Sequence, residues 1–481
     1  MSAEYDEYVS QYGYPFDENA FTAEQVSYFL VIHEEEITLA DAIERLSTDR
    51  RLDVLNIEKT EDFVKFAVEY QGRIWRGALH IDETDYDPFN SNMRQEGFME
   101  GELMQCRSRS RQRLTVTLEF TPRILASLKL QFLLSEIFAP KMLLLVDTNA
   151  YCIYHARACH FFANLKAELP IEVLYGFHGV AAEEGEQVWI HTHGLYRAGL
   201  PDIEIIGLNR ELINERMQLV ASYVRSMVDD RLAEGAEWPE PTVDFDDFPA
   251  DKTEDILSMI GFEAVGASFN EREGLGLTTL PWQAVVEVEE GDGTLTIGGL
   301  DSREDGEHTN PSGALVGVFL NGEEDERDED STEAEYELRS LDEFNDELAK
   351  PTLMIYYSDE ASAAMRELAA ESTPWLEKAV KVREVFGEEA QIIVKAGLAP
   401  NKSLDNNPPA LEHCWFNLES INGDTFRGRL MHDVFYIEGA KEGDVLEVPL
   451  SQVSDWSFLG AGPGRAYQLD MMLEAIRAKS S

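Results

Sequence analysis

The amino-acid sequence predicts an α+β protein, with mixed or antiparallel sheets flanked by helices and a small, barrel-like antiparallel domain at the C-terminus. Two observations favour this class. Segments with apolar residues at every second position, typical of strands, come in clusters with helical segments between them. This alternation is too irregular for a doubly wound parallel sheet. At 481 residues the chain is also too long for a single core, so two or three domains are expected.

The first part of the chain is expected to open with two helices and to continue mainly as strands. Thr22 and Thr38 each stand three residues before a Gln or an Asp, a spacing that caps helix starts because the hydroxyl accepts from free backbone N–H groups. Further helices are predicted at 122–138 and 209–233. Strands are predicted at 52–58, 62–70, 73–82, 114–120, 142–146, 171–178, 187–193 and 202–208.

Composition divides the chain into three domains, at 1–235, 250–371 and 373–481. The segment 235–241 contains Gly and two Pro residues and is typical of a linker. The second domain carries an acidic loop at 323–337, whose like charges repel one another and resist burial. The remaining elements expected before the third domain are strands at 284–289, 294–297, 314–320 and 352–357 and a helix at 360–370. The third domain is expected to begin with a helix at Thr373 and to continue with a strand at 391–395.

The net charge of −52 limits the classes of partner that the protein can bind. So many like charges oppose binding to nucleic acids and to anionic membranes, and neither is expected as a partner. A basic protein partner would be attracted electrostatically. Two other interpretations stay open: a host with a high-salt cytoplasm, and a solvated surface that keeps the protein soluble.

The sequence favours a cytoplasmic location. Residues 1–10 contain neither a basic segment nor an apolar one, so no secretory signal is expected. The most apolar stretch, 124–146, is interrupted by charged residues and a proline, which predicts a helix followed by a buried strand rather than a membrane span. The four cysteines have no metal-binding spacing and are expected to be reduced thiols.

The most distinctive motif contains two histidines and two acidic residues. His191 and His193 alternate on one predicted strand, and Asp202 and Glu204 alternate on the next. If the chain folds back between them, the four side chains converge and suit zinc or another divalent metal, with Arg197 placed to bind an anion. The alternative is a structural corner whose polar groups satisfy one another.

A short basic segment is the second candidate site. If the segment is extended, its alternate arginines lie on one side and form a row that suits a phosphate or carboxylate. Pairing with carboxylates of the same chain is the alternative. The four arginines are Arg107, Arg109, Arg111 and Arg113.

The C-terminal unit resembles a known family. It contains Glu412-His-Cys-Trp415, Gly428 with Leu430, the turn Gly443-Asp444 and Ser454-Asp-Trp456, and its expected aromatic core is formed by Trp415, Phe426 and Trp456. These motifs are similar to those of the YegJ-type bacterial domain of unknown function. The segment from His191 to Arg197 also resembles an uncharacterised bacterial family that carries such a domain at its C-terminus. The resemblance implies a multidomain bacterial protein and assigns no catalytic residue.

Two functions follow as expectations. The first is a non-enzymatic cytosolic bacterial protein that acts through protein–protein contacts, regulatory or immunity-like toward a basic partner. The second is a metal-dependent hydrolase that uses His191, His193, Asp202 and Glu204, with zinc as the candidate metal. The sequence leaves enzymatic activity undecided, although it leans against it, and it leaves the oligomeric state open.

Overall fold

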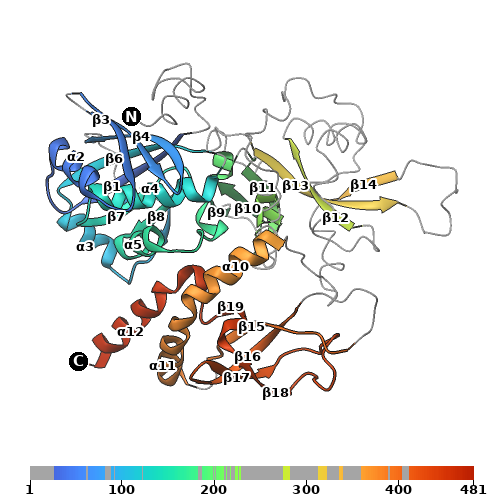
Figure 1. Ribbon diagram of the computed structural model, residues 1–481. Helices are drawn as coiled ribbons and strands as arrows, with labels where there is room; N and C mark the ends of the chain where they lie inside the picture. The colour runs from blue at the N-terminus through green and yellow to red at the C-terminus, as the bar shows by residue number, and fades with distance from the viewer. Residues whose placement is uncertain are drawn as a thin grey trace.

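The computed structural model confirms the α+β class: three separate sheets are flanked by helices (Figure 1). Among the described residues the C-terminal sheet is small and antiparallel, but it does not close into a barrel. The described residues are 26–60, 63–81, 88–90, 93–121, 123–181, 187–198, 200, 202–210, 213, 217, 221, 223–225, 227–228, 275–281, 312–321, 335–339, 359–387, 390–402 and 411–480.

The first sheet has eight strands in the order β2-β3-β4-β6-β1-β7-β8-β5. Its neighbouring strands are antiparallel except for β5 and β8, which run parallel. The strands are β1 (Val26–His33), β2 (Asp53–Lys59), β3 (Phe63–Tyr70), β4 (Arg73–Ile81), β5 (Arg94–Glu96), β6 (Gln112–Glu119), β7 (Met142–Asp147) and β8 (Cys152–His155). The helices of this region are α2 (Leu39–Thr48), α3 (Glu102–Arg109), α4 (Ile124–Phe138) and α5 (Ala156–Asn164).

Helix α4 forms the centre of the main core. Every residue of the helix except Glu136 is buried, as expected for a helix that is apolar on all sides. Most of its polar groups bind other parts of the core: Ser127 Oγ accepts from the indole of Trp75 at 2.9 Å, and the Gln131 amide nitrogen donates to backbone oxygens of β1 and β6. The described part of the chain contains no helix with the length and apolar character needed to cross a bilayer.

The expected helix after Thr22 is wrong, because residues Val26–His33 form β1. Residues 22–25 lie outside the described part. β1 lies between β6 and β7 and is almost wholly buried, so its apolar residues complete the sheet, and this outweighs a local capping signal. The second capping signal is confirmed: Asp41 N donates to Thr38 Oγ1, and Thr38 N donates back to Asp41.

The second sheet is mixed and has the order β12-β13-β11-β10-β9, with β14 also pairing with β13. Its bounds are β9 (Gly176–Ala181), β10 (Gln187–His193), β11 (Asp202–Asn209), β12 (Leu275–Pro281), β13 (Ser312–Asn321) and β14 (Glu335–Arg339). The strand expected at 171–178 begins instead with a 3-10 turn, η3 (Ile171–Val173). Glu335 to Glu337, expected in the acidic loop, belong to β14. The expected strands at 284–289, 294–297 and 352–357 lie outside the described residues.

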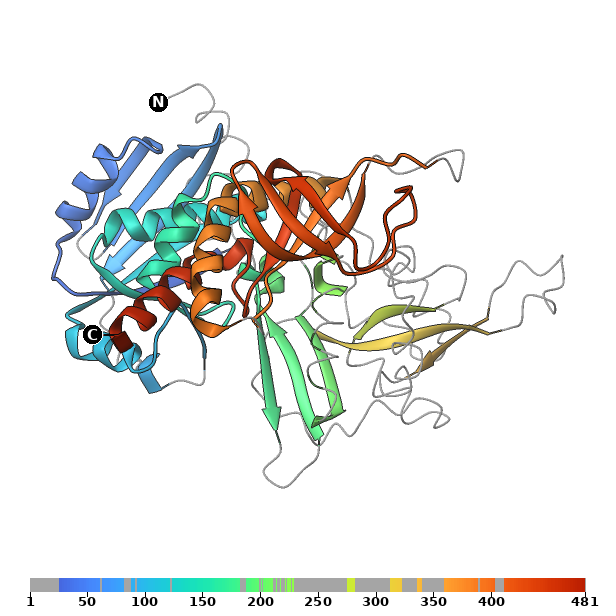
Figure 2. The same ribbon diagram turned by 90° about the horizontal axis from the view of Figure 1, so that it is seen from below.

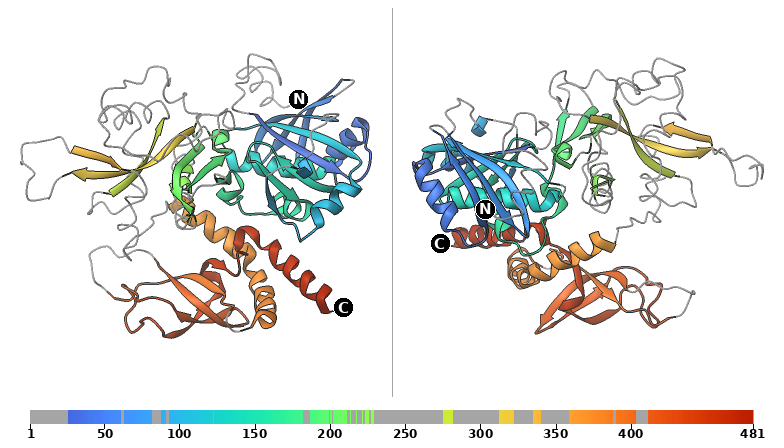
Figure 3. Two further views of the ribbon diagram at one scale, coloured as in Figure 1. Left: turned by 180° about the vertical axis from the view of Figure 1, so that it is seen from behind. Right: turned by 45° about the horizontal axis from the view of Figure 1, so that its top comes forward.

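The pairing of β11 with β13 joins strands from both sides of the predicted linker. The two strands run parallel, with Asp202 opposite Ser312. Figure 3 shows β9 to β11, in green, beside the first sheet and the yellow strands farther from it. The three domain boundaries given above stay predictions. Between β11 and the linker, the described residues from 213 to 228 are helical, within the expected helix at 209–233.

The C-terminal region combines a five-stranded antiparallel sheet, of order β18-β17-β16-β15-β19, with helices on one face. Phe426 and Trp456 are buried in its core as expected, but Trp415 is only half-buried, because it lies on the opposite face of β16 from Cys414 and Phe416. The elements are α10 (Asp359–Ser372), α11 (Leu376–Phe386), β15 (Ile393–Leu398), β16 (Glu412–Asn422), β17 (Thr425–Leu430), β18 (Val445–Pro449), β19 (Val453–Ser457) and α12 (Tyr467–Ser480).

Helices α10 and α12 connect the C-terminal region to the first sheet. The Tyr467 hydroxyl, at the start of α12, donates to the buried carboxylate of Glu96 in β5. In α10, Glu371 accepts from the backbone N–H groups of Lys166 and Ala167 at 2.8–3.0 Å. Figures 1 and 2 show α12 beside α5. These polar contacts fix the position of the C-terminal domain.

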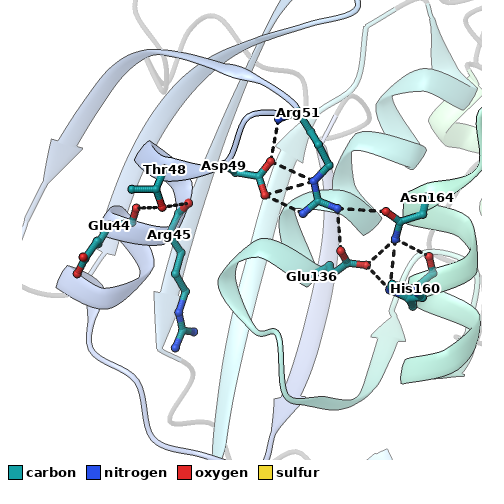
Figure 4. Close-up of polar contacts among 8 residues, drawn as sticks. All are labelled: Glu44, Arg45, Thr48, Asp49, Arg51, Glu136, His160 and Asn164. Carbon is teal, nitrogen blue, oxygen red and sulfur yellow. Dashed lines mark hydrogen bonds and ion pairs between the residues drawn. The ribbon is translucent and has the colours of Figure 1, made fainter.

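A partly exposed polar network links α4 and α5 to the segment after α2 (Figure 4). Arg51 pairs with Asp49 at 2.7 Å and with Glu136 at 2.8 Å, and it donates to Asn164 at 3.2 Å. His160 contacts the second oxygen of Glu136 at 2.9 Å. Exposed pairs of this kind contribute little individually, so the network serves mainly to position the ends of these helices.

The substitution Tyr467→Phe is expected to destabilise the protein by about 1–2 kcal/mol, because the buried Glu96 carboxylate loses a hydrogen bond. Urea denaturation followed by circular dichroism measures the change. The matched control is Tyr28→Phe at a side chain in β1 that is 44% exposed, where little effect is expected. Equal midpoints for the two variants would show that the Tyr467 hydroxyl does not stabilise the fold.

Candidate functional site

The histidine motif forms a buried corner of the second sheet. Strands β10 and β11 are antiparallel, and His191 lies directly opposite Glu204. A short 3-10 turn, η4 (Leu195–Ala198), lies between them and carries Arg197. The chain therefore folds back as expected. All five predicted side chains are buried, namely His191, His193, Arg197, Asp202 and Glu204.

The two histidines belong to a cluster of aromatic rings. His191 lies 4.0 Å from Trp189 and 4.8 Å from His193, measured between ring centroids. His178, opposite His191 on β9, lies 5.7 Å from His191 and 5.0 Å from His193. Tyr151, from the turn between β7 and β8, stacks on His193 at 4.8 Å. The cluster thus connects the second sheet to the first.

The two carboxylates hold the hairpin together. Glu204 accepts from the indole N–H of Trp189 at 2.9 Å. Asp202 accepts from the Thr192 hydroxyl and from the backbone N–H of Leu195, both at 3.1 Å. Burial raises the pKa of the Asp202 carboxyl to about 7, and these hydrogen bonds act in the opposite direction.

Arg197 contacts internal groups rather than an external anion. Its guanidinium pairs with Asp147, the last residue of β7, at 3.1 Å, and the two side chains are 1% and 0% exposed. It also donates to Ser27 Oγ at 3.2 Å and to the carbonyl oxygen of Leu174. The expectation that Arg197 binds an external anion is therefore wrong, because the guanidinium is buried and its charge is already paired within the protein.

Two glycines allow this corner to form. A Cβ atom on Gly176 would lie 2.1 Å from the carbonyl oxygen of Ala150, which no side chain tolerates. Gly194 has a φ of 109°, and a Cβ there would lie 2.7 Å from the carbonyl oxygen of Leu174. The close backbone approach at both glycines brings β9 and η4 against the turn that carries Tyr151.

The described residues include no group of three or more His, Cys, Asp or Glu side chains arranged to hold a metal ion. The expected convergence of His191, His193, Asp202 and Glu204 on one metal is thus not formed in this conformation, because both carboxylates bind groups of the hairpin itself. The metal-dependent hydrolase stays a prediction.

The expectation that the four arginines form one extended row is wrong. Arg107 and Arg109 lie in α3, whereas Arg113 lies in β6 and Arg111 lies between the two elements. Arg109 pairs with Glu34 at 2.6 Å, and the guanidinium of Arg107 lies 5.9 Å from the centre of the Phe89 ring. The contact of Arg109 is of the kind that the alternative of pairing with carboxylates of the same chain expects, whereas the contact of Arg107 is with a ring.

The sequence interpretation missed Asp147, Ser27 and Tyr151. Asp147 directly follows the buried strand segment 142–146, and an acidic residue in that position was the available signal for a buried partner of an arginine. Ser27 and Tyr151 carried no local signal, because they approach the corner only through the packing of the two sheets.

Three segments of the chain match protein-family models. Residues 27–168 match the N-terminal part, and residues 177–316 the C-terminal part, of a protein of unknown function (DUF4026). Residues 360–479 match an uncharacterized protein conserved in bacteria (DUF2314). No curated protein and no solved structure shows significant similarity to the chain. The prediction of an uncharacterised multidomain family is confirmed at this level.

Removal of the Arg197 charge is expected to destabilise the protein strongly. Arg197→Leu leaves Asp147 buried without its counter-charge, which typically costs about 3–5 kcal/mol. Arg197→Lys keeps the charge but loses the forked geometry, and an intermediate loss is expected. Urea denaturation midpoints measure both effects. The control is Arg109→Ala, at the exposed pair with Glu34, whose midpoint is expected to stay close to that of the unmodified protein. An Arg197→Leu protein as stable as this control would contradict the role of the buried pair.

The burial of Asp202 predicts a pH-dependent stability. Its pKa in the folded protein, about 7, lies above the ordinary value of 3.8. The stability that comes from protonation of this carboxyl group is therefore complete below pH 3.8 and is lost as the pH rises through 7. Asp202→Asn cannot titrate. From pH 5 to pH 8, the free energy of unfolding of the unmodified protein is therefore expected to fall relative to that of Asp202→Asn, by on the order of 2 kcal/mol.

Denaturation at both pH values measures this difference. The control is Asp53→Asn at an exposed position of β2, which is expected to keep the pH dependence of the unmodified protein. Identical pH profiles for Asp202→Asn and the unmodified protein would contradict the assignment of the titration to Asp202.

Proposed function

We propose that this chain, which joins both halves of one uncharacterised family to an uncharacterised domain conserved in bacteria, acts by binding another protein rather than by catalysis. The partner that we propose is a basic protein in the bacterial cytoplasm, toward which the chain has a regulatory or immunity-like role. We also propose that the C-terminal domain is of the YegJ type, on the resemblance of its motifs in β16 and β19.

The observation that carries this proposal is the net charge of −52. A surface with so large a negative charge repels other acidic surfaces and attracts basic ones over several ångströms, which accelerates encounter with a basic partner. The consecutive residues Glu323 to Asp330 include a single basic residue, Arg327, and are the densest acidic segment of the sequence.

The arrangement of the histidine corner supports a non-catalytic role. A catalytic group has to reach a substrate, but Arg197, Asp202 and Glu204 are each 0% exposed. Each one also holds a part of the fold: Arg197 links two sheets, and the carboxylates bind the hairpin. These contacts give three residues of the motif a part in the fold, which supports the proposal.

Exposed apolar side chains support binding to a protein. Phe435 is 68% exposed, although its loop is well ordered: Glu412 accepts from the backbone N–H groups of Phe435 and Tyr436 at 2.7 and 2.8 Å. Val385 and Phe386, at the end of α11, are 60% and 56% exposed. Large apolar residues held in the solvent by ordered backbone are typical of contact surfaces.

The proposal predicts a salt-sensitive complex. Tagged protein, incubated at low salt with a lysate of the bacterium that encodes it, is expected to recover a basic protein in stoichiometric amount. The same complex is expected to weaken at least tenfold in about 1 M NaCl, because the Debye length shortens to about 3 Å. Affinity measured with the purified partner at several salt concentrations tests this.

A pair of variants tests the acidic segment. Replacing the acidic residues between 323 and 330 by Ser and Asn is expected to slow association, whereas a permuted segment of the same composition is expected to associate normally. The proposal fails if no stoichiometric basic protein is recovered at low salt, or if the affinity does not depend on salt.

A further inference from the structure

The outer face of the C-terminal sheet carries a polar cluster that the proposed function does not use. Strand β15 lies between β16 and β19, near the end of the sheet that packs on α10 (Figure 1). Lys395 of β15 lies opposite Trp415 on one side and opposite Asp455 on the other. Its Nζ atom lies 5.6 Å from the centre of the Trp415 ring. All three side chains are half-buried, so solvent reaches the cluster.

A glycine extends this cluster across β15. Gly397 lies opposite His413 on β16, and a Cβ atom on Gly397 would lie 3.3 Å from the imidazole and 2.9 Å from Leu411. The bare backbone lets the ring lie across β15. On the far side, His413 Nδ1 forms a 2.9 Å hydrogen bond with the hydroxyl of Ser454, which stands at a register shift of β19.

Two arginines of the neighbouring helical segments act electrostatically on the cluster. Arg366 belongs to α10, which packs on β19. Arg225, from the helical segment after β11, contacts Met365 of α10 at 3.2 Å and pairs with Glu172. Among the described charges that act on this cluster, Asp455 is the carboxylate that faces Lys395, and the charges that act on His413 are positive.

The positive groups destabilise one another in this position. Burial lowers the pKa of Lys395, and Arg225 lowers it further, although Asp455 acts in the opposite direction. Burial also lowers the pKa of His413, to which Lys395 and Arg366 contribute. Half-buried titratable groups shifted by like charges are typical of binding sites. In a protein with a net charge of −52, several positive groups that act on one another within the described residues are a distinct feature.

We propose that the cluster of Lys395, His413, Trp415, Ser454 and Arg366 binds a small molecule through an oxyanion group, a carboxylate or a phosphate. The ammonium and guanidinium groups neutralise the oxyanion, the imidazole and hydroxyl supply hydrogen bonds, and the exposed side of Trp415 contacts the body of the ligand. His413, Trp415, Ser454 and Asp455 are also residues of the two C-terminal motifs, which lie far apart in the sequence and meet here.

The same domain offers a matched control. Lys378 of α11 also lies over a tryptophan, with its Nζ atom 3.5 Å from the centre of the Trp375 ring, and it pairs with Asp470 of α12 at 2.9 Å. This second lysine lies between two helices, on the other face of the sheet. A substitution there removes the same charge from the same chemical surroundings, but it leaves the proposed site unchanged.

Thermal unfolding of the full chain tests the proposal. Inorganic phosphate and succinate are each titrated at constant ionic strength, with sodium chloride as the reference. At least one of the two anions is expected to raise the Tm of the unmodified protein and of Lys378→Met by several degrees, because a ligand that binds only the folded state stabilises it. Lys395→Met, which keeps an apolar side chain over Trp415, is expected to lose most of this increase.

A second measurement makes the result independent of overall stability. Isothermal titration calorimetry gives the Kd of the anion, and Lys395→Met is expected to weaken binding at least tenfold while circular dichroism shows an unchanged fold. The proposal is overturned if neither anion stabilises the protein beyond chloride, or if Lys395→Met and Lys378→Met respond equally. Neither outcome bears on the basic protein partner proposed above.

Discussion

The buried ion pair between Arg197 and Asp147 is the constraint on which the corner depends. A guanidinium in the interior is stable only when its charge is compensated and its N–H groups have acceptors. Arg197 finds these at the end of β7, in β1 and on the carbonyl oxygen of Leu174. Because these groups belong to the first sheet and to the segment before β9, the pair determines how the second sheet is placed against the first. The ring cluster around His193 then fills the remaining space.

Much of the fold could be predicted from alternation and capping, but β1 and the corner could not. The strands from β2 to β4 lie within one residue of their expected bounds, and Thr38 begins α2 as its spacing indicates. β1 was mistaken for a helix because its strand character depends on two neighbours from later in the chain, β6 and β7. The turn back from His193 to Asp202 was predictable. Asp147 could be suspected of having a buried cationic partner, but its pairing with Arg197 could not be predicted, since 50 residues separate the two. The prediction of an extended row of arginines was wrong for a similar reason, because arginines at alternate positions do not by themselves distinguish α3 from a strand.

Residues that look catalytic in the sequence are held by buried contacts in this fold. Histidines, carboxylates and an arginine at short spacing are typical of metal sites, yet the same groups are also the ones that can satisfy buried hydrogen bonds. In this fold Asp202 and Glu204 are buried and accept hydrogen bonds from groups of the hairpin. The C-terminal sheet presents the opposite case. Its Lys395, His413 and Trp415 are only partly buried and lie on the outer face of the sheet.

The parallel pairing of β11 with β13 has a consequence for synthesis of the protein. Asp202 pairs with Ser312, so β11 gains this neighbour only after roughly 110 further residues have been translated. At about 5–20 residues per second, the hairpin of β10 and β11 then waits for several seconds with one unpaired edge. Unpaired strand edges in nascent chains are sites of aggregation and of chaperone binding. The second sheet is therefore completed late in translation. The yield of folded protein in a cell then depends on how well the free edge of β11 is protected during elongation.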